Sequence, residues 1–268
     1  MKQITRISVR HRLILVVLSS FILSAPASAA VGPHTASDLW RAGKYEQAIE
    51  AGKTENTAES LSVAARAAVS DMMTRIPPCL DCVLRAQDLA RRAIAADPKA
   101  PLPHVYLAVS LGYEARIVGL LESQSKGIPE ESKSALEAAI AFDPKNTLAI
   151  ATLGGWNIDA VRIGGAMLAR LTYGARIDDG IAYFTQAIAM DPGDFVIRYQ
   201  YALSLASYDV DKYHDVIADQ LARATETKSA SVYESVSQSR ASDLLDLLKA
   251  GDRQAFASQV KLYMGIPE

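Results

Sequence analysis

The sequence predicts an all-α fold built from repeated units. Residues 93–98, 139–144 and 187–192 read AIAADP, AIAFDP and AIAMDP, so one pattern returns at spacings of 46 and 48 residues. Upstream of each proline the apolar side chains recur at helical spacing, as Leu136 and Ile140 do, and a proline after such a run ends the helix. Beyond residue 30 we find no convincing run of alternating β-branched residues, so no strand is expected.

The first 29 residues have the pattern of a secretory signal peptide. A basic start precedes an apolar run over residues 13–23, and Ala27-Ser28-Ala29 provides a small-residue cleavage site. The apolar run is shorter than the roughly 20 residues that a membrane span needs. We therefore expect cleavage after Ala29, a periplasmic or secreted location, and no stable membrane insertion after cleavage. An uncleaved signal anchor is the alternative.

The chain expected after cleavage is mildly acidic. It holds 24 basic and 30 acidic residues, a net charge of −6. Domains that bind nucleic acid are usually basic, so we expect no nucleic-acid partner. The whole chain of 268 residues is 50% hydrophobic and 22% charged, which is a globular composition, and its two cysteines are too few for a disulfide-stapled small fold.

Helical spacing and helix stops divide residues 30–268 into successive helix pairs. The first pair contains a partial repeat, GKYEQAI, at residues 43–49. From about residue 231, the DLLDLLK segment and a later run with Phe256 and Tyr263 predict two short capping helices. The pairs are expected at 35–54, 57–96, 102–142, 146–190 and 194–226, with the capping helices within 231–264.

These repeats resemble the tetratricopeptide repeat. In that family the second helix of a pair ends in an A-x-x-x-x-P pattern, as at Ala93–Pro98, and the first helix carries a leucine–glycine pair. Leu111-Gly112 and Leu153-Gly154 fit that place, whereas the third copy has Leu203-Ser204. The resemblance implies an α-solenoid of antiparallel helix pairs that winds into a right-handed superhelix.

The spacing of 46 to 48 residues exceeds the usual period of about 34 residues. The excess fits three to four extra helical turns, so we expect long first helices at roughly 102–124 and 146–172. The layout from Leu153 to Pro192 also resembles the repeat region of the regulator-of-microtubule-dynamics family, over about residues 85–210. That likeness supports long-helix repeats, and the cytoskeletal role is not expected of a chain with a secretion signal.

The tetratricopeptide resemblance further implies a concave groove, lined by the first helix of each pair, that takes a peptide or helix of a protein partner. Asp159 and Arg162 lie three residues apart on one helix face and could form an internal ion pair instead. Tyrosine and arginine are favoured as binding anchors. The groove side chains that the resemblance places are Tyr106, Tyr113, Arg116, Asp159, Arg162, Arg198, Tyr201 and Tyr208.

Cys79-Leu-Asp-Cys82 is a C-x-x-C motif that follows two prolines and opens a helical run. Outside the cytosol two such thiols oxidise, so we expect a small disulfide that clamps a loop to a helix start. A redox-active pair is an alternative because a helix N-terminus favours the thiolate. The absence of a βαβ pattern, Asp81 between the thiols and the lack of a histidine after Cys82 argue against it. Free thiols remain possible, and a zinc site would need two further ligands.

No G-x-S-x-G, P-loop or H-E-x-x-H motif occurs in the sequence, so we expect no catalytic residue, no cofactor and no metal. The predicted function is binding of a protein or peptide in the concave groove, as an exported scaffold or assembly factor. One alternative is a thiol–disulfide redox protein that uses Cys79 and Cys82. The other is a structural component that associates with itself as a homo-oligomer.

Overall fold

The computed structural model describes residues 33–267, so the expected signal peptide at 1–29 lies outside the described residues. The prediction of an all-α solenoid is confirmed for this part of the chain, which contains fourteen helices and no strand. The helices are α1 (Pro33–Arg41), α2 (Tyr45–Glu55), α3 (Ala58–Thr74), α4 (Leu80–Ala96), α5 (Pro101–Val118), α6 (Leu120–Ser125), α7 (Ile128–Phe142), α8 (Thr147–Gly164), α9 (Ala166–Tyr173), α10 (Ile177–Met190), α11 (Phe195–Asp209), α12 (His214–Glu226), α13 (Val232–Ala250) and α14 (Arg253–Met264).

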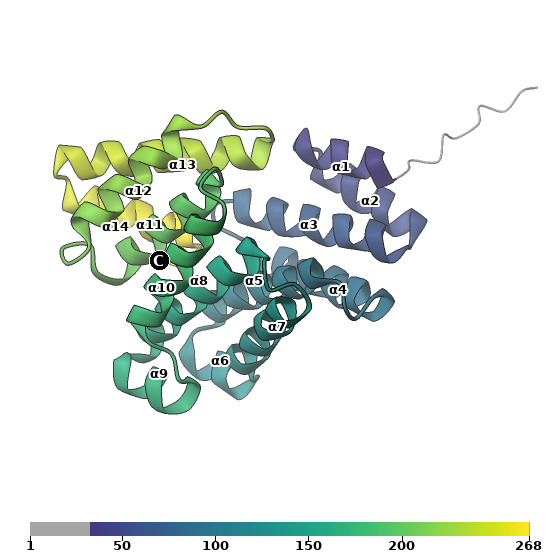
Figure 1. Ribbon diagram of the computed structural model, residues 1–268, viewed down its shortest axis with the longest axis horizontal. Helices are drawn as coiled ribbons and strands as arrows, with labels where there is room; N and C mark the ends of the chain where they lie inside the picture. Colours follow the sequence, from purple (N-terminus) through teal and green to yellow (C-terminus); the bar gives the residue numbers. More distant parts are fainter. Residues whose placement is uncertain (1–32, 268) are drawn as a thin grey trace, which may run out of the picture. The chain divides into compact units, whose positions relative to one another are not determined.

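Twelve of these helices pack as six neighbouring pairs (Figure 1). The pairs are α1–α2, α3–α4, α5–α7, α8–α10, α11–α12 and α13–α14. We call the first members, α1, α3, α5, α8, α11 and α13, the inner helices. Each inner helix contacts the next one in this series. No helix in the described range combines the length and apolar character that crossing a membrane requires.

The Asp-Pro signals end the second helices where the sequence predicts. The helices α4, α7 and α10 each stop one residue before the aspartate, whose backbone is extended, with φ between −142° and −134°. A following proline disfavours the helical conformation for that residue. In each copy the aspartate carboxylate accepts a hydrogen bond from the backbone N–H two residues later, at 3.0–3.2 Å, and this turn fixes the path into the next helix.

The expectation of long helices at 102–124 and 146–172 is wrong, because a glycine breaks each of them. The helix α5 ends before Gly119 (φ 84°, ψ 176°) and α8 ends before Gly165 (φ 76°, ψ 156°). Only glycine adopts this backbone conformation readily. The extra residues of the two long repeats therefore form separate short helices, α6 and α9, each of which begins directly after its glycine.

Small residues allow close helix crossing in the fourth pair. A Cβ atom on Gly154 of α8 would lie 2.9 Å from the carbonyl oxygen of Gly180 in α10, and one on Gly180 would lie 2.8 Å from Ile158. Gly112, the equivalent residue by sequence in the third pair, differs, because a Cβ atom there would meet nothing within 4 Å. The Leu-Gly pairs thus occupy matching places in sequence but different environments in the fold.

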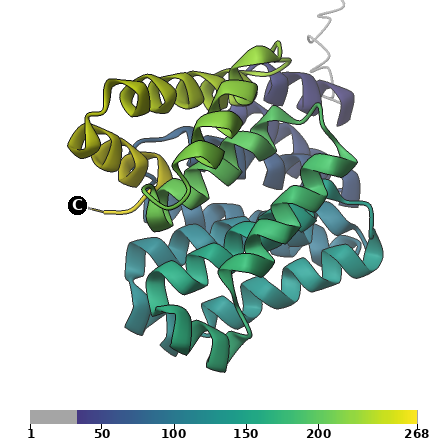
Figure 2. The ribbon, with the colours of Figure 1, turned by 60° about the vertical axis from the view of Figure 1, so that its left-hand side comes forward.

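The last helix pair returns to the second one, since α13 contacts α3. The buried Arg240 of α13 donates to the carbonyl oxygens of Met73 at 2.8 Å and Thr74 at 3.1 Å. Carbonyls at a helix C-terminus lack partners within the helix and attract cations, so this guanidinium satisfies the end of α3. Gly265, which follows α14, packs against Pro78 in the linker after α3, and Figure 2 shows the yellow α14 beside this blue linker.

Candidate functional site: a cavity among the inner helices

A cavity of about 740 Å³ lies among the inner helices. Its walls are mainly apolar, with a small number of polar groups, which is typical of sites that bind small molecules. All six inner helices contribute side chains to it. One from each is Trp40 of α1, Arg66 of α3, Tyr106 of α5, Trp156 of α8, Gln200 of α11 and Tyr233 of α13.

The cavity extends along the inner helices from their N-terminal to their C-terminal ends. At the first end it is lined by Leu102 of α5, Leu148 of α8 and the loop residue Lys228, all of which are exposed. At the other end it is lined by Leu120 and Ile163, which are half-buried. We call the exposed end, formed by Leu102, Leu148 and Lys228, the entrance.

Both tryptophans of the chain line the cavity, and each ring is held in place by a hydrogen bond. The Trp40 Nε1–H donates to Ser70 Oγ at 2.8 Å, and the Arg66 guanidinium lies 3.4 Å from the centroid of the Trp40 ring. The Trp156 Nε1–H donates to the Pro129 carbonyl at 3.2 Å. Fixed aromatic walls lose little conformational entropy when a ligand binds.

A half-buried ion-pair cluster joins α5 to α8 at the cavity wall. Asp159 Oδ1 accepts from Arg162 Nε and Nη2, both at 2.9 Å, and Asp159 Oδ2 accepts from Arg116 Nε at 2.9 Å and from its Nη2. Burial opposes ionisation of Asp159, but the two guanidiniums outweigh it and hold the pKa of Asp159 below its ordinary value. Arg116 Nη1 also donates to the Met264 carbonyl at 3.1 Å, which fastens the end of α14 to the cluster.

The structure brings four of the eight predicted groove residues to the cavity. Tyr106, Tyr113, Arg116 and Asp159 line it. Arg162 is next to them through its ion pair with Asp159. Burial raises the pKa of Tyr113, which lies beneath the Arg116 guanidinium at 4.8 Å and stays neutral there.

The other three predicted residues, Arg198, Tyr201 and Tyr208, lie on α11 and do not line the cavity. Tyr201 is buried and stacks on Phe184 of α10, with the ring centroids 4.8 Å apart. Arg198 donates to Gln220 of α12 at 3.1 Å. The lining face of α11 instead carries Gln200, Leu203 and Ser204 among others. Consecutive helix residues are about 100° apart, so Tyr201 faces away from the cavity although its neighbour Gln200 lines it.

Sequence reasoning missed Arg66, Gln200 and the cavity positions of both tryptophans. Arg66 is the one exposed residue between Ala64 and Ser70 of α3, a run that is otherwise buried. A single charge within an apolar helix is therefore the signal that could have identified it, as it identified Arg116. Glu114 carries the same signal but has a structural role, because its buried carboxylate accepts from Gln87 at 2.7 Å and pairs with Lys126 at 3.1 Å.

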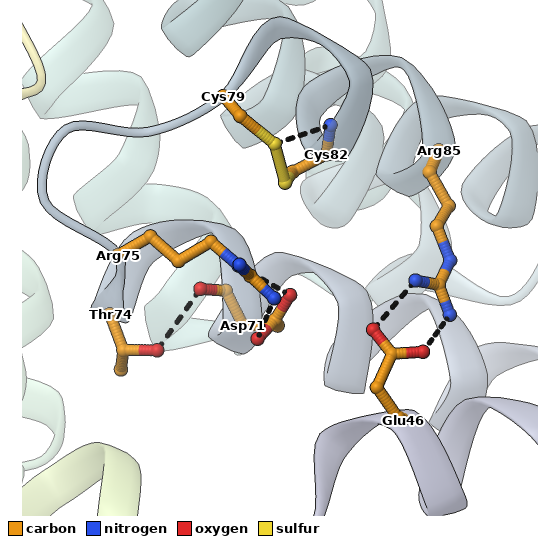
Figure 3. Close-up of a disulfide and its surroundings, with 7 residues drawn as sticks. All are labelled: Glu46, Asp71, Thr74, Arg75, Cys79, Cys82 and Arg85. Atoms are coloured by element: carbon orange, nitrogen blue, oxygen red, sulfur yellow. Dashed lines mark hydrogen bonds and ion pairs between the residues drawn. A yellow bond between two sulfur atoms is a disulfide. The ribbon is translucent and has the colours of Figure 1, made fainter.

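The predicted disulfide between Cys79 and Cys82 is present (Figure 3). Cys79 is the N-cap of α4, and its sulfur accepts from the Cys82 backbone N–H at 3.1 Å. Cys79 is exposed and Cys82 is half-buried. Within the described residues, no group of three or more His, Cys, Asp or Glu side chains is placed to hold a metal ion.

No family model matches this chain, and no curated protein shows significant similarity to it. The resemblance to tetratricopeptide repeats therefore remains a prediction from the repeat motifs. The cavity itself is the strongest structural indication of function.

Proposed function

We propose that this chain is an exported tetratricopeptide-like binding protein whose cavity holds a segment of a peptide or protein partner, as a scaffold or assembly factor. The single observation that carries the proposal is the cavity of about 740 Å³ to which every inner helix contributes. This volume is within the range of roughly 300–1,000 Å³ found for sites that enclose small ligands.

The residue types on the walls support a peptide as the occupant. Trp40, Trp156, Tyr106 and Tyr113 line the cavity, and aromatic side chains of this kind supply most of the binding energy in protein interfaces. Arg66 stands beside Trp40 as an exposed cation. An apolar segment with a carboxylate would therefore find both an apolar wall and a charge partner.

The entrance offers exposed apolar side chains to a partner segment. Leu102 is 38% exposed and Leu148 is 36% exposed there, beside Lys228. A preformed cavity also needs no rearrangement on binding, which lowers the cost of association.

Gly112 provides a test that separates binding from folding. This glycine lies within α5 and lines the cavity, and a Cβ atom there would meet nothing within 4 Å. Replacing a helical glycine with alanine or leucine improves helix propensity by up to about 1 kcal/mol. We expect both Gly112→Ala and Gly112→Leu to fold at least as stably as the wild type, while only the leucine fills the cavity.

The experiment places a photo-crosslinking amino acid at Thr152, which lines the cavity, and at Thr172, an exposed residue of α9 outside it. Cells are irradiated intact and the adducts are identified by mass spectrometry. We expect peptide or protein adducts at Thr152 that Gly112→Ala retains and Gly112→Leu removes. Titration of the recovered segment, followed by tryptophan fluorescence, should show at least tenfold weaker binding to Gly112→Leu.

Two outcomes would contradict the proposal. One is the same set of adducts at Thr152 and Thr172, which would indicate surface collisions. The other is a set of Thr152 adducts that Gly112→Leu leaves unchanged, which would place the partner outside the cavity. Adducts between two copies of this chain would support the self-associating alternative instead.

A further inference from the structure

The disulfide lies in an exposed setting that a purely structural clamp does not require. Cys79 is exposed at the N-terminus of α4, and Cys82 lies one helical turn further on (Figure 3). The bond closes a loop of only four residues, and the stabilisation from loop closure shrinks with loop length. The same turn is already held by the Val83 N–H, which donates to the Cys79 carbonyl at 3.1 Å, and by burial of the Val83 side chain.

Exposed apolar side chains flank the two cysteines. Leu80 is 39% exposed and Leu84 is 44% exposed, one turn apart on the same face of α4, and Ile76 in the preceding linker is 45% exposed. Such side chains are usually buried. Together with the linker prolines, they provide an apolar contact surface beside a reactive bond.

Two arginines near the disulfide are paired with carboxylates, whereas Asp81, between the two cysteines, is exposed and forms no ion pair within residues 33–267. Arg75 forms an ion pair with Asp71 at 2.9 Å, and Arg85 binds both carboxylate oxygens of Glu46, at 2.7 and 2.6 Å (Figure 3). The hydrogen bonds from Arg85 hold the pKa of Glu46 below its ordinary value. Apart from Asp81, the charges named here are therefore neutralised by a partner, and Leu80, Leu84 and Ile76 offer the apolar contact area to a ligand.

We propose that Cys79 and Cys82 form a thiol–disulfide exchange site that oxidises a pair of cysteine thiols in an apolar segment of a reduced protein or peptide. The proposal is independent of the cavity, which lies among the inner helices. The partner must carry cysteine thiols, because a thiolate is the group that readily attacks a disulfide.

The exchange takes place in two balanced steps. A substrate thiolate attacks the exposed Cys79 sulfur, the bond between Cys79 and Cys82 breaks, and Cys82 leaves as a thiolate that takes a proton from water. The second substrate thiolate then attacks the substrate sulfur of the mixed disulfide and releases Cys79. Two electrons pass from the substrate dithiol to the cysteine pair, and the substrate gains a disulfide.

The N-cap position assists the second step. The Cys82 N–H that points at Cys79 sulfur, together with the positive end of the helix dipole, stabilises the negative charge that Cys79 carries when it leaves. The more exposed cysteine is therefore also the better leaving group. The mixed disulfide therefore forms on Cys79, and the half-buried Cys82 is the thiol released in the first step.

The first test uses the purified, oxidised chain and a reduced apolar peptide that contains two cysteines. We expect the chain to transfer one disulfide to the peptide at least tenfold faster than oxidised glutathione does at the same concentration. The Leu80→Ser/Leu84→Ser double variant should slow oxidation of the peptide at least threefold and leave reduction of the chain by dithiothreitol unchanged. Far-UV circular dichroism checks that it folds.

The second test compares two single variants that each keep one thiol. Mixed with the disulfide form of the same peptide, Cys82→Ser should form a covalent adduct through Cys79 at least tenfold faster than Cys79→Ser forms one through Cys82. Equal adduct rates would overturn the proposal, as would peptide oxidation no faster than by glutathione. Gly112→Leu should leave both assays unchanged, so a failure here is distinct from a failure of the cavity proposal.

Discussion

Arg240 joins the last helix pair to the second one, and its replacement by alanine tests how strongly that junction is held. Its guanidinium reaches the carbonyl oxygens of Met73 and Thr74, which lie more than 160 residues away in sequence. It also lies over the ring of Tyr263, at 4.9 Å from the centroid. The side chain is buried, so these contacts are little screened by water.

The expected cost of Arg240→Ala is about 4 kcal/mol, near the lower end of the sum of its contacts. Each of the two hydrogen bonds from the charged guanidinium contributes about 1.5–3 kcal/mol, and the cation–π contact adds at least about 0.5–1 kcal/mol. The upper end of this sum is not expected, because the freed carbonyls at the end of α3 become accessible to water once the side chain is gone.

Urea unfolding followed by tryptophan fluorescence measures this change, since Trp40 of α1 is hydrogen-bonded to Ser70 of α3. The control is Arg253→Ala, an arginine whose side chain is 81% exposed and pairs with Asp211 at 3.0 Å. Exposed pairs contribute at most about 1 kcal/mol. A loss below about 1 kcal/mol for Arg240→Ala, or equal losses for the two variants, would refute the reasoning.

Three further predictions concern stability at low pH, the glycine that ends α8, and the core. The pKa of Asp159 lies below the ordinary 3.8 in the folded protein. Its carboxylate therefore stabilises the fold above pH 3.8, and this stabilisation is lost as the pH falls through the folded pKa. In thermal melts Asp159→Asn should cost more stability at pH 7 than at pH 3, and equal costs would disprove this. Gly165→Ala should cost about 1–3 kcal/mol in urea unfolding because of its positive φ, whereas Gly164→Ala, at the helical position next to it, should cost nothing. Phe184→Ala removes a ring that is 2% exposed and should cost about 3–5 kcal/mol; a loss under 1 kcal/mol would contradict its core position.

The sequence predicts helix ends well where the signal is local. The three Asp-Pro motifs mark the ends of α4, α7 and α10 within one residue, and the expected helix pairs coincide with the observed ones. Each of these stops depends on a proline and on an aspartate that caps its own turn. Such interactions extend over two or three residues and are therefore visible in the sequence.

The sequence does not predict features that depend on distant residues. Gly119 and Gly165 occur in helical patterns, and only their backbone angles distinguish them from Gly112 and Gly154, which continue their helices. The face that α11 turns to the cavity, which excludes Tyr201, depends on its packing against α8, α10 and α12. Two helices, α13 and α14, do follow residue 231, but α13 has 19 residues and is not the short helix that the sequence predicts, and nothing local to it indicates that it reaches α3.

The contact between α13 and α3 has a consequence for how such a molecule melts and evolves. An open repeat array can lose its terminal unit first, and it can gain or lose units during evolution with little penalty. Here the terminal pair is fastened to an early one through Arg240. The unfolding transition should therefore be a single cooperative step without fraying from the C-terminal end. Insertion or deletion of a whole unit between α3 and α13 would separate the two ends of this junction, so we expect the number of pairs between them to be constrained.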